Sequence, residues 1–404
     1  MSDPVRAAGR YRWVVLGVAT FTQAAAAFFV QGIGAMSVHL QRDLDLNTTR
    51  LGLLLSAAQL LPLAGLLVAG RLLDRHDERW VVGTGALVVA VALAAGSLAP
   101  GYVSLLAALL IVGAGYSTIQ PGGSKSVASW FDTSQRGLAM GIRQAGLPLG
   151  GVLSASALPA LATAFGWRST LVAGALVALA GAVAFMAFYR RPPHRPPART
   201  ASPMRLDLLR EPYMKKVILS GTCLVSVHSG LGVLTVLYLH EVASMEAAPA
   251  ALVYVAVQCA GALGRVCLAA WSDRHKSGRY ACVLACLAAV IAGMALLATP
   301  AGRSPAVACL LFVWLGFFGI GWYGPWVAYA AEAAPPDRTG FALGLAMAVN
   351  QVAIILAPPA LGLLTDVTGG FAAAWVLLAV LTGLTLAATA RRTTVGGGRP
   401  GRIA

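Results

Sequence analysis

The sequence predicts an all-α membrane protein with twelve transmembrane helices in two pseudo-symmetric six-helix halves. Three observations support this prediction: long apolar segments, a charged fraction of only 11%, and one polar segment that divides the apolar segments evenly. Hydrophobic residues make up 58% of the 404 residues, and so little charge cannot cover the surface of a soluble globular domain. Each apolar segment is close to the roughly 20 residues that cross a hydrocarbon core. We therefore expect a polytopic membrane protein.

Twelve apolar segments have the length of a transmembrane span. They are residues 13–40, 49–73, 80–99, 103–131, 137–163, 168–189, 213–239, 249–272, 279–299, 304–331, 339–365 and 370–390. The two six-helix bundles are then residues 13–189 and 213–390, with tails at residues 1–12 and 391–404. Residues 190–212 are rich in proline and arginine, which favours an extended linker over a packed core.

The net charge of +15 is explained by membrane topology, and no nucleic-acid partner is needed. Most basic residues outside the spans gather on one side, in both tails, in the linker and in the loops after spans 2, 4, 8 and 10. The other side keeps only Arg42, Arg50, Arg168 and Arg303. The positive-inside rule places the basic side, with both termini, in the cytoplasm. The Ala-, Gly-, Leu- and Arg-rich composition is typical of a high-GC prokaryotic genome, which indicates the plasma (inner) membrane.

Sequence motifs of enzymes and metal sites are not found. The chain has no G-x-S-x-G elbow, P-loop or HExxH motif, and its six cysteines include no CxxC pair. The glycine-rich segment 113–123 lies inside an apolar span, so it lacks the strand–turn–helix context of a phosphate loop. We expect no enzymatic activity, no cofactor and no metal.

Two short motifs occur in both halves. "GRLLDR" at residues 70–75 follows span 2, and "AAWSDR" at residues 269–274 follows span 8. "RGLAMG" at residues 136–141 opens span 5, and "TGFALG" at residues 339–344 opens span 11. The two pairs have nearly the same spacing, which indicates two related halves of a kind that recurs in transporters.

These motifs resemble those of the major facilitator superfamily, and the resemblance covers essentially the whole chain. The loop signature of that family, Gly-x-x-x-Asp-Arg followed by further basic residues, matches Gly70, Asp74, Arg75 and Arg79. Its second copy matches Ser272, Asp273, Arg274, Gly278 and Arg279. The resemblance implies the major facilitator fold and assigns Gly70, Asp74, Arg75, Asp273 and Arg274 to a cytoplasmic gate. In the family the aspartate interacts with a neighbouring helix N-terminus, which favours negative charge.

Three cationic side chains lie inside predicted spans, where a charge is costly and usually functional. Lys125, Arg143 and Arg265 are each about 10–12 Å from the cytoplasmic edge by helix rise. The sequence suggests no acidic residue at comparable depth, so an anionic substrate is the expected partner. A guanidinium matches a carboxylate with a planar fork of donors. Two alternatives stay open: Lys125 snorkels to the headgroups, or Arg143 binds backbone carbonyls freed near Pro148.

Several uncharged polar side chains fall near the midplane. They are Gln23, Gln120, Trp322, Tyr323 and Asn350, and either substrate contact or interhelical hydrogen bonding explains them. We select Gln120, Tyr323 and Asn350, with the three cations, as the substrate site. His228 is the histidine deepest in a span, and it either carries a coupling proton or bonds a neighbouring helix.

The resulting hypothesis is a monomeric secondary transporter of a small organic anion, a carboxylate, that works by alternating access. Proton symport through His228 and anion exchange both stay open. Arg265 in span 8 resembles the substrate-binding arginine of monocarboxylate and oxalate-type carriers of the superfamily, although Gly261 replaces the aspartate common in those carriers. One alternative is an exporter of a drug or secondary metabolite, with an apolar cavity floored by Trp322 and Tyr323. Another is a membrane sensor or assembly factor that binds without transport.

Overall fold

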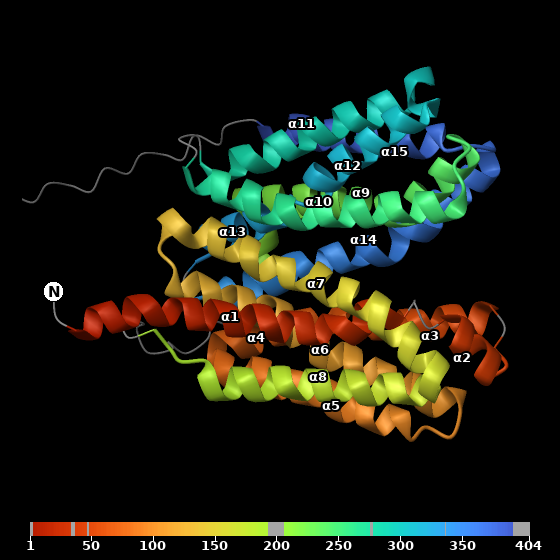
Figure 1. Ribbon diagram of the computed structural model, residues 1–404. Coiled ribbons are helices and arrows are strands. Elements are labelled where there is room, and N and C mark those ends of the chain that lie inside the picture. The colour runs from red at the N-terminus through yellow and green to blue at the C-terminus, as the bar shows by residue number, and fades with distance from the viewer. Residues whose placement is uncertain are drawn as a thin grey trace, which may run out of the picture.

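The computed structural model describes residues 3–33, 37–46, 48–192, 206–274, 278–335 and 337–390. Within these residues every regular element is a helix (Figure 1). The first half contains α1 (Asp3–Gly32), α2 (Ser37–Asp43), α3 (Thr48–Leu60), α4 (Pro62–Arg75), α5 (Glu78–Ser97), α6 (Tyr102–Trp130), α7 (Thr133–Phe165) and α8 (Trp167–Phe188). The second half contains α9 (Pro212–Glu241), α10 (Ala247–Arg274), α11 (Arg279–Leu297), α12 (Pro305–Gly319), α13 (Tyr323–Ala333), α14 (Thr339–Thr368) and α15 (Ala372–Ala390).

Eleven helical segments among the described residues are long and apolar enough to cross a membrane. The remaining crossing, the second along the chain, is formed by the two shorter helices α3 and α4. They separate at Leu61, because Pro62 has no N–H and begins α4. A second break, at residues 320–322, divides the tenth crossing into α12 and α13. Pro325 and the glycines around this break weaken the helical ladder there. The predicted twelve-span, two-half fold is confirmed.

The two halves lie side by side along their length, with α7 and α14 between them (Figure 1). The main contacts across the interface are those of α7 with α10 and of α4 with α14. Helix α1 begins at the end of the bundle that also holds Asp74, Arg136, Arg279 and Arg338. We call this end the basic end, and the other end, which holds Arg168 packed on Trp167, the opposite end.

The structure changes the expected bounds of the first span and adds a short helix to the expected linker. Helix α1 extends from Asp3 to Gly32, so the first span lies nearer the N-terminus than residues 13–40. The glycine at its end is followed by the separate short helix α2. At the end of the expected linker, a 3₁₀ helix (η2, Leu206–Arg210) packs through its buried residue Leu208. The C-terminal tail and linker residues 193–205 lie outside the described part.

Glycines let the two halves approach at backbone distance near the basic end. A Cβ on Gly344 of α14 would collide with the carbonyl oxygen of Leu66 on α4. A Cβ on Gly141 of α7 would collide with the carbonyl oxygen of Arg265 on α10. Both glycines close the repeated six-residue motif of their half. The internal repeat therefore supplies two equivalent close contacts.

Replacement of Gly344 by alanine is expected to weaken this closure, because the methyl group meets a backbone atom that cannot move aside cheaply. The apparent melting temperature of the purified protein should fall. Gly362 of the same helix has no heavy atom within 4 Å of a Cβ position, so Gly362→Ala is the matched control and should leave the melting temperature unchanged or raise it. Equal melting temperatures for the two variants would contradict the close contact.

Candidate functional site

A central cavity of about 280 Å³ lies between the two halves. Its lining extends from Arg265 and Tyr323 toward the opposite end, where it includes Gln31, the penultimate residue of α1. The polar residues of its lining are Gln31, Gln59, Tyr116, Ser117, Gln120, His228, Ser229, Tyr254, Gln258, Arg265, Tyr323, Asn350 and Gln351. No aspartate or glutamate lines this cavity among the described residues. Five of the predicted site residues therefore share one cavity, in which the fixed charge is positive.

Arg265 is held by carbonyl groups at the floor of the cavity. Its Nη1 donates to the Gln144 carbonyl oxygen at 2.9 Å, and its Nε donates to the Ile320 carbonyl oxygen at 3.3 Å. The Ile320 carbonyl lies at the break between α12 and α13, so the local interruption of the helix helps to position the guanidinium. The Tyr323 ring lies 5.8 Å from the guanidinium carbon. Arg265 is only 2% exposed, yet its Nη2 has no acceptor among the described residues.

Two side-chain hydrogen bonds join the halves across the cavity. The Tyr323 hydroxyl on α13 donates to Gln120 Oε1 on α6 at 3.0 Å. The Gln351 amide on α14 donates to Gln59 Oε1 on α3 at 3.1 Å. These uncharged pairs connect the two halves at the cavity.

Asn350 and His228 belong to the cavity lining and have unused hydrogen-bonding capacity. Neither Oδ1 nor Nδ2 of Asn350 has a hydrogen-bond partner, although the side chain is only 2% exposed. A buried amide without partners is costly, and polar cargo in the cavity would remove that cost. His228 on α9 lines the same cavity as Arg265, and the structure gives its ring no hydrogen-bond partner among the described residues.

Arg143 does not line the cavity, in contrast to the prediction that it contacts substrate directly. Its guanidinium is fully buried and donates to Ser124 Oγ at 2.8 Å, to Gln23 Oε1 at 2.8 Å and to the Ile119 carbonyl oxygen at 3.0 Å. The alternative interpretation, a lock between helices, is closer to this geometry. The carbonyl it uses belongs to α6, however, and not to the helix around Pro148. Gly123 allows this contact, since a Cβ there would lie 2.6 Å from Arg143 Nε.

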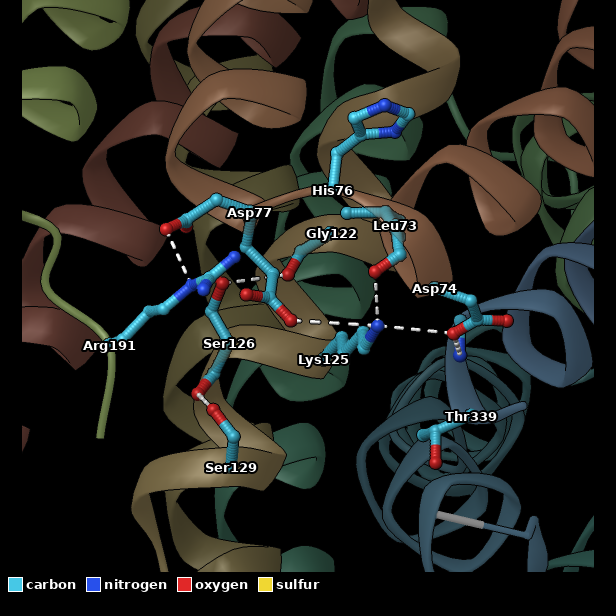
Figure 2. Close-up of polar contacts among 12 residues, drawn as sticks. Leu73, Asp74, His76, Asp77, Gly122, Lys125, Ser126, Ser129, Arg191 and Thr339 are labelled. Carbon is cyan, nitrogen blue, oxygen red and sulfur yellow. Dashed lines mark hydrogen bonds and ion pairs between the residues drawn. The ribbon is translucent and has the colours of Figure 1, made fainter. Parts of the chain in front are cut away.

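Lys125 also lies outside the cavity lining, and the expectation that it has no carboxylate partner is wrong. Its ammonium lies 3.1 Å from Asp74 Oδ1 and 3.6 Å from Glu78 Oε1, and it also contacts the Leu73 carbonyl (Figure 2). The long side chain reaches toward the basic end, where α4 ends and α5 begins, but it is buried and ends on two carboxylates rather than at the headgroups of the snorkelling alternative. An ammonium shared by two carboxylates has no charge to spare for a substrate. We therefore leave Lys125 out of the proposed substrate site.

The two motif aspartates each bind backbone N–H groups of the other half at the basic end. Asp74 accepts hydrogen bonds from Gly340 N and Phe341 N in the first turn of α14, both at 2.8 Å. First-turn N–H groups have no partner within their own helix, and the helix N-terminus favours a negative charge. Asp273 accepts from Gly137 N at 2.8 Å and from Leu138 N at 2.7 Å on α7.

The cations that complete these two contacts differ from the two arginines assigned to the gate. Arg75 and Arg274 are exposed at the ends of α4 and α10. In the second half, Arg279 contacts Asp273 directly and binds Glu332 at 2.7 Å. It also binds the Thr133 carbonyl oxygen, whose usual partner in an α-helix, the N–H of Gly137, is taken by Asp273.

The acid and the cation occupy opposite positions in the networks of the two halves. In the first half the extra acid, Glu78, opens α5, and the cation Lys125 lies on α6. In the second half the cation Arg279 opens α11, and the acid Glu332 lies on α13. Arg136 adds a 3.4 Å contact from α7 to Glu332, so this network also spans the two halves.

Sequence reasoning missed Tyr116, Gln59 and Gln351 in the cavity, and Glu78 and Glu332 at the basic end. Glu78 follows Asp74 by four residues, across the turn between α4 and α5, and this second carboxylate close to the end of the span would have indicated a partner for a lysine at that depth. Tyr116 precedes the selected Gln120 by four residues and so lies on the same helix face. Among the described residues no group of three or more His, Cys, Asp or Glu side chains is placed to hold a metal ion.

Comparison with known proteins agrees with this architecture. The model of the Major Facilitator Superfamily matches residues 19–358. The chain belongs to the major facilitator superfamily. An uncharacterized MFS-type transporter of Mycobacterium tuberculosis is 29% identical over 378 residues, which cover 91% of this chain and 82% of that protein. A probable galactarate/D-glucarate transporter of Bacillus subtilis is 24% identical over 381 residues, covering 84% of this chain and 82% of that protein. A hexuronate transporter of Bacillus subtilis is 29% identical over 154 residues, covering 38% of this chain and 36% of that protein.

Solved structures of this superfamily share the fold. The human organic anion transporter MFSD10 aligns with a TM-score of 0.77 at 16% identity, covering 95% of this chain and 99% of that chain. A proton:xylose symporter aligns with a TM-score of 0.76 at 14% identity, covering 94% of this chain and 95% of that chain. Identities this low establish the fold alone. The family model and the named relatives, rather than these structures, make the protein a multi-pass membrane transporter of the major facilitator superfamily and not an enzyme.

Proposed function

We propose that the protein is a secondary transporter that moves a small organic anion with a carboxylate group by alternating access. The main support is Arg265, a guanidinium at the cavity floor with Nη2 unbonded and no carboxylate within ion-pair distance among the described residues. Neutral carbonyls orient Arg265 but leave its charge in place. Because a buried charge is stabilised by a counter-charge, an anion is the cargo that suits this cavity.

The uncharged lining favours a cargo that also has hydroxyl groups. Asn350 offers an unpaired amide, and Gln59, Gln120 and Gln351 add further amide groups around the cavity. Amides both donate and accept, which suits hydroxyl groups of either orientation. The names of three relatives point to the same class of cargo: a hexuronate transporter, a probable L-galactonate transporter and a probable galactarate/D-glucarate transporter.

The proposal includes an orientation and a conformational state. The basic end faces the cytoplasm of a prokaryotic cell, because the positive-inside rule applies to the arginines gathered there. The contacts of Asp74 and Asp273 close that end, and the cavity extends toward the opposite end as far as Gln31. We take this as the state open toward the outside. One chain lines the whole cavity, so a monomer is sufficient for transport.

Uptake into proteoliposomes tests this function. Vesicles with the purified protein should accumulate labelled galacturonate, L-galactonate or D-glucarate, and empty vesicles should not. A neutral sugar should compete weakly. If none of these acids enters while a lipophilic drug-like compound is moved, the protein is an exporter with a neutral cargo and the anion proposal is wrong.

His228 is proposed to couple proton movement to anion movement. A protonated imidazole adds a second positive charge to the cavity that Arg265 lines, so proton binding and anion binding should strengthen each other reciprocally. His228→Asn is expected to abolish the stimulation of uptake by an inward proton gradient. Exchange of internal for external anion, measured without a gradient, should continue at a similar rate. A variant that still responds fully to the gradient would show that the proton travels elsewhere or that transport is not proton-coupled.

A further inference from the structure

The directions of the hydrogen bonds around the cavity floor show which atoms remain free for a ligand. A guanidinium has only donors, so Gln23 must turn its amide oxygen toward Arg143, where Oε1 accepts from Nη2 at 2.8 Å. The amide nitrogen of Gln23 then faces the other way and donates to the Tyr116 hydroxyl oxygen at 3.3 Å. The oxygen of Tyr116 is thus occupied as an acceptor by an interaction that begins at Arg143.

The hydrogen of the Tyr116 hydroxyl is left to donate, and Tyr116 lines the cavity. The other half contributes a parallel arrangement. The Tyr323 hydroxyl donates to Gln120 Oε1, which turns the Gln120 amide nitrogen away from Tyr323. Tyr116 and Gln120 are four residues apart on α6, and the Tyr323 ring is 5.8 Å from the Arg265 guanidinium. These groups form one continuous floor.

The free groups on this floor are therefore donors: Arg265 Nη2 and the Tyr116 hydroxyl, because the Gln120 amide nitrogen is on the side of the Tyr116 oxygen. No aspartate or glutamate among the described residues lines the cavity to compete for them. A carboxylate has two oxygens that only accept, so it matches this set, whereas a cation or a donor-rich ligand does not.

We infer that Tyr116 is a direct ligand of the substrate carboxylate, and that Arg143 is a positioning residue which orients the Tyr116 hydroxyl through Gln23. This inference rests on the proposed anion transport. It gives Arg143, buried away from the cavity, a role that neither substrate contact nor a simple lock between helices describes. It also places the carboxylate between Tyr116 of the first half and Arg265 of the second, so that the bound anion joins the two halves.

Binding of D-galacturonate to the purified full-length protein tests the inference. Tyr116→Phe keeps the ring and removes the hydroxyl, and it should raise the Kd roughly tenfold or more, as expected for a hydrogen bond to a charged group. Binding of neutral galactose should change little. Tyr329→Phe is the matched control, because Tyr329 lies outside the cavity lining and its ring packs at a tilt against the ring of Tyr280. The Kd of this variant should equal that of the wild type.

The relay through Gln23 makes a second, sharper prediction. Gln23→Met should also raise the Kd for D-galacturonate, because the Tyr116 hydroxyl loses its fixed orientation. In the Tyr116→Phe background the same substitution should have little further effect, since the relay then has no hydroxyl to orient. Additive losses in the double variant would show that Gln23 acts only on the packing of α1, α6 and α7 and would overturn the positioning role.

The outcomes separate this inference from the proposed function. If wild-type protein binds D-galacturonate and loses it with Arg265→Ala but not with Tyr116→Phe, anion transport stands and Tyr116 is not a ligand. If wild-type protein binds none of the acids in the uptake panel, the proposed function fails and the inference fails with it. A Tyr116→Phe loss that is equal for galacturonate and galactose would also overturn carboxylate recognition by this hydroxyl.

Discussion

Arg265→Ala is expected to abolish measurable uptake of organic anions. Removal of one partner from a buried, hydrogen-bonded charge pair typically costs about 2–5 kcal/mol of binding free energy. Such a loss weakens affinity roughly 30-fold to several thousand-fold. Arg265→Lys keeps the charge but loses the planar fork and the bonds to Gln144 and Ile320, so it should retain weak binding only. Initial rates of uptake over a range of substrate concentrations measure both effects.

A matched arginine at the opposite end serves as the control for Arg265. Arg168 also binds a backbone carbonyl, that of Ala99 at 3.0 Å, and it lies on Trp167 outside the cavity. Arg168→Ala should leave the affinity for anions unchanged. Comparable losses of affinity in both variants would mean that arginine removal harms the fold in general, and the assignment of Arg265 to the substrate would lose its support.

Asp74→Ala and Asp273→Ala are expected to loosen the basic end, each at the helix of the other half that the carboxylate binds: α14 for Asp74 and α7 for Asp273. Each carboxylate accepts two backbone N–H bonds across the interface, and a hydrogen bond to a charged group contributes about 1.5–3 kcal/mol. Hydrogen exchange followed by mass spectrometry should show faster exchange at residues 340–341 in Asp74→Ala. In Asp273→Ala the faster exchange should appear at residues 137–138. The change in rate should be at least tenfold.

Each gate variant is the control for the other. Asp74→Ala should leave exchange at residues 137–138 near its wild-type rate, because Asp273, Arg279 and Glu332 remain in place there. The double variant should release both helices and increase access to the cavity from the basic end. Unchanged exchange at both sites in the single variants would contradict the contacts that close this end.

The fold and the gate aspartates were predictable because they depend on signals that lie along the chain. Apolar length marks the spans, and the repeated motif puts Asp74 and Asp273 at equivalent loops. Arg265 was also within reach of sequence reasoning, since its depth in span 8 is set by helix rise and no carboxylate lies near it in the sequence. These features need no knowledge of how each helix is rotated.

The remaining site residues depend on helix rotation and on side-chain reach, which the sequence does not reveal. Arg143 lies at a depth similar to that of Arg265, yet it faces α6 and α1 rather than the cavity. Lys125 has its Cα inside the span, but its ammonium reaches Asp74 and Glu78 at the helix ends. Tyr116 looks like an ordinary apolar residue of its span until the hydrogen bond from Gln23 is known.

The central claim is that the cavity recognises a carboxylate through Arg265. Its most direct test is equilibrium binding of galacturonate and of neutral galactose to the purified wild-type protein, by calorimetry at fixed pH. The two ligands share most of their hydroxyl groups and differ mainly in charge. We predict saturable binding of galacturonate at least tenfold tighter than that of galactose. Equal binding of both sugars, or tighter binding of galactose, would contradict the account.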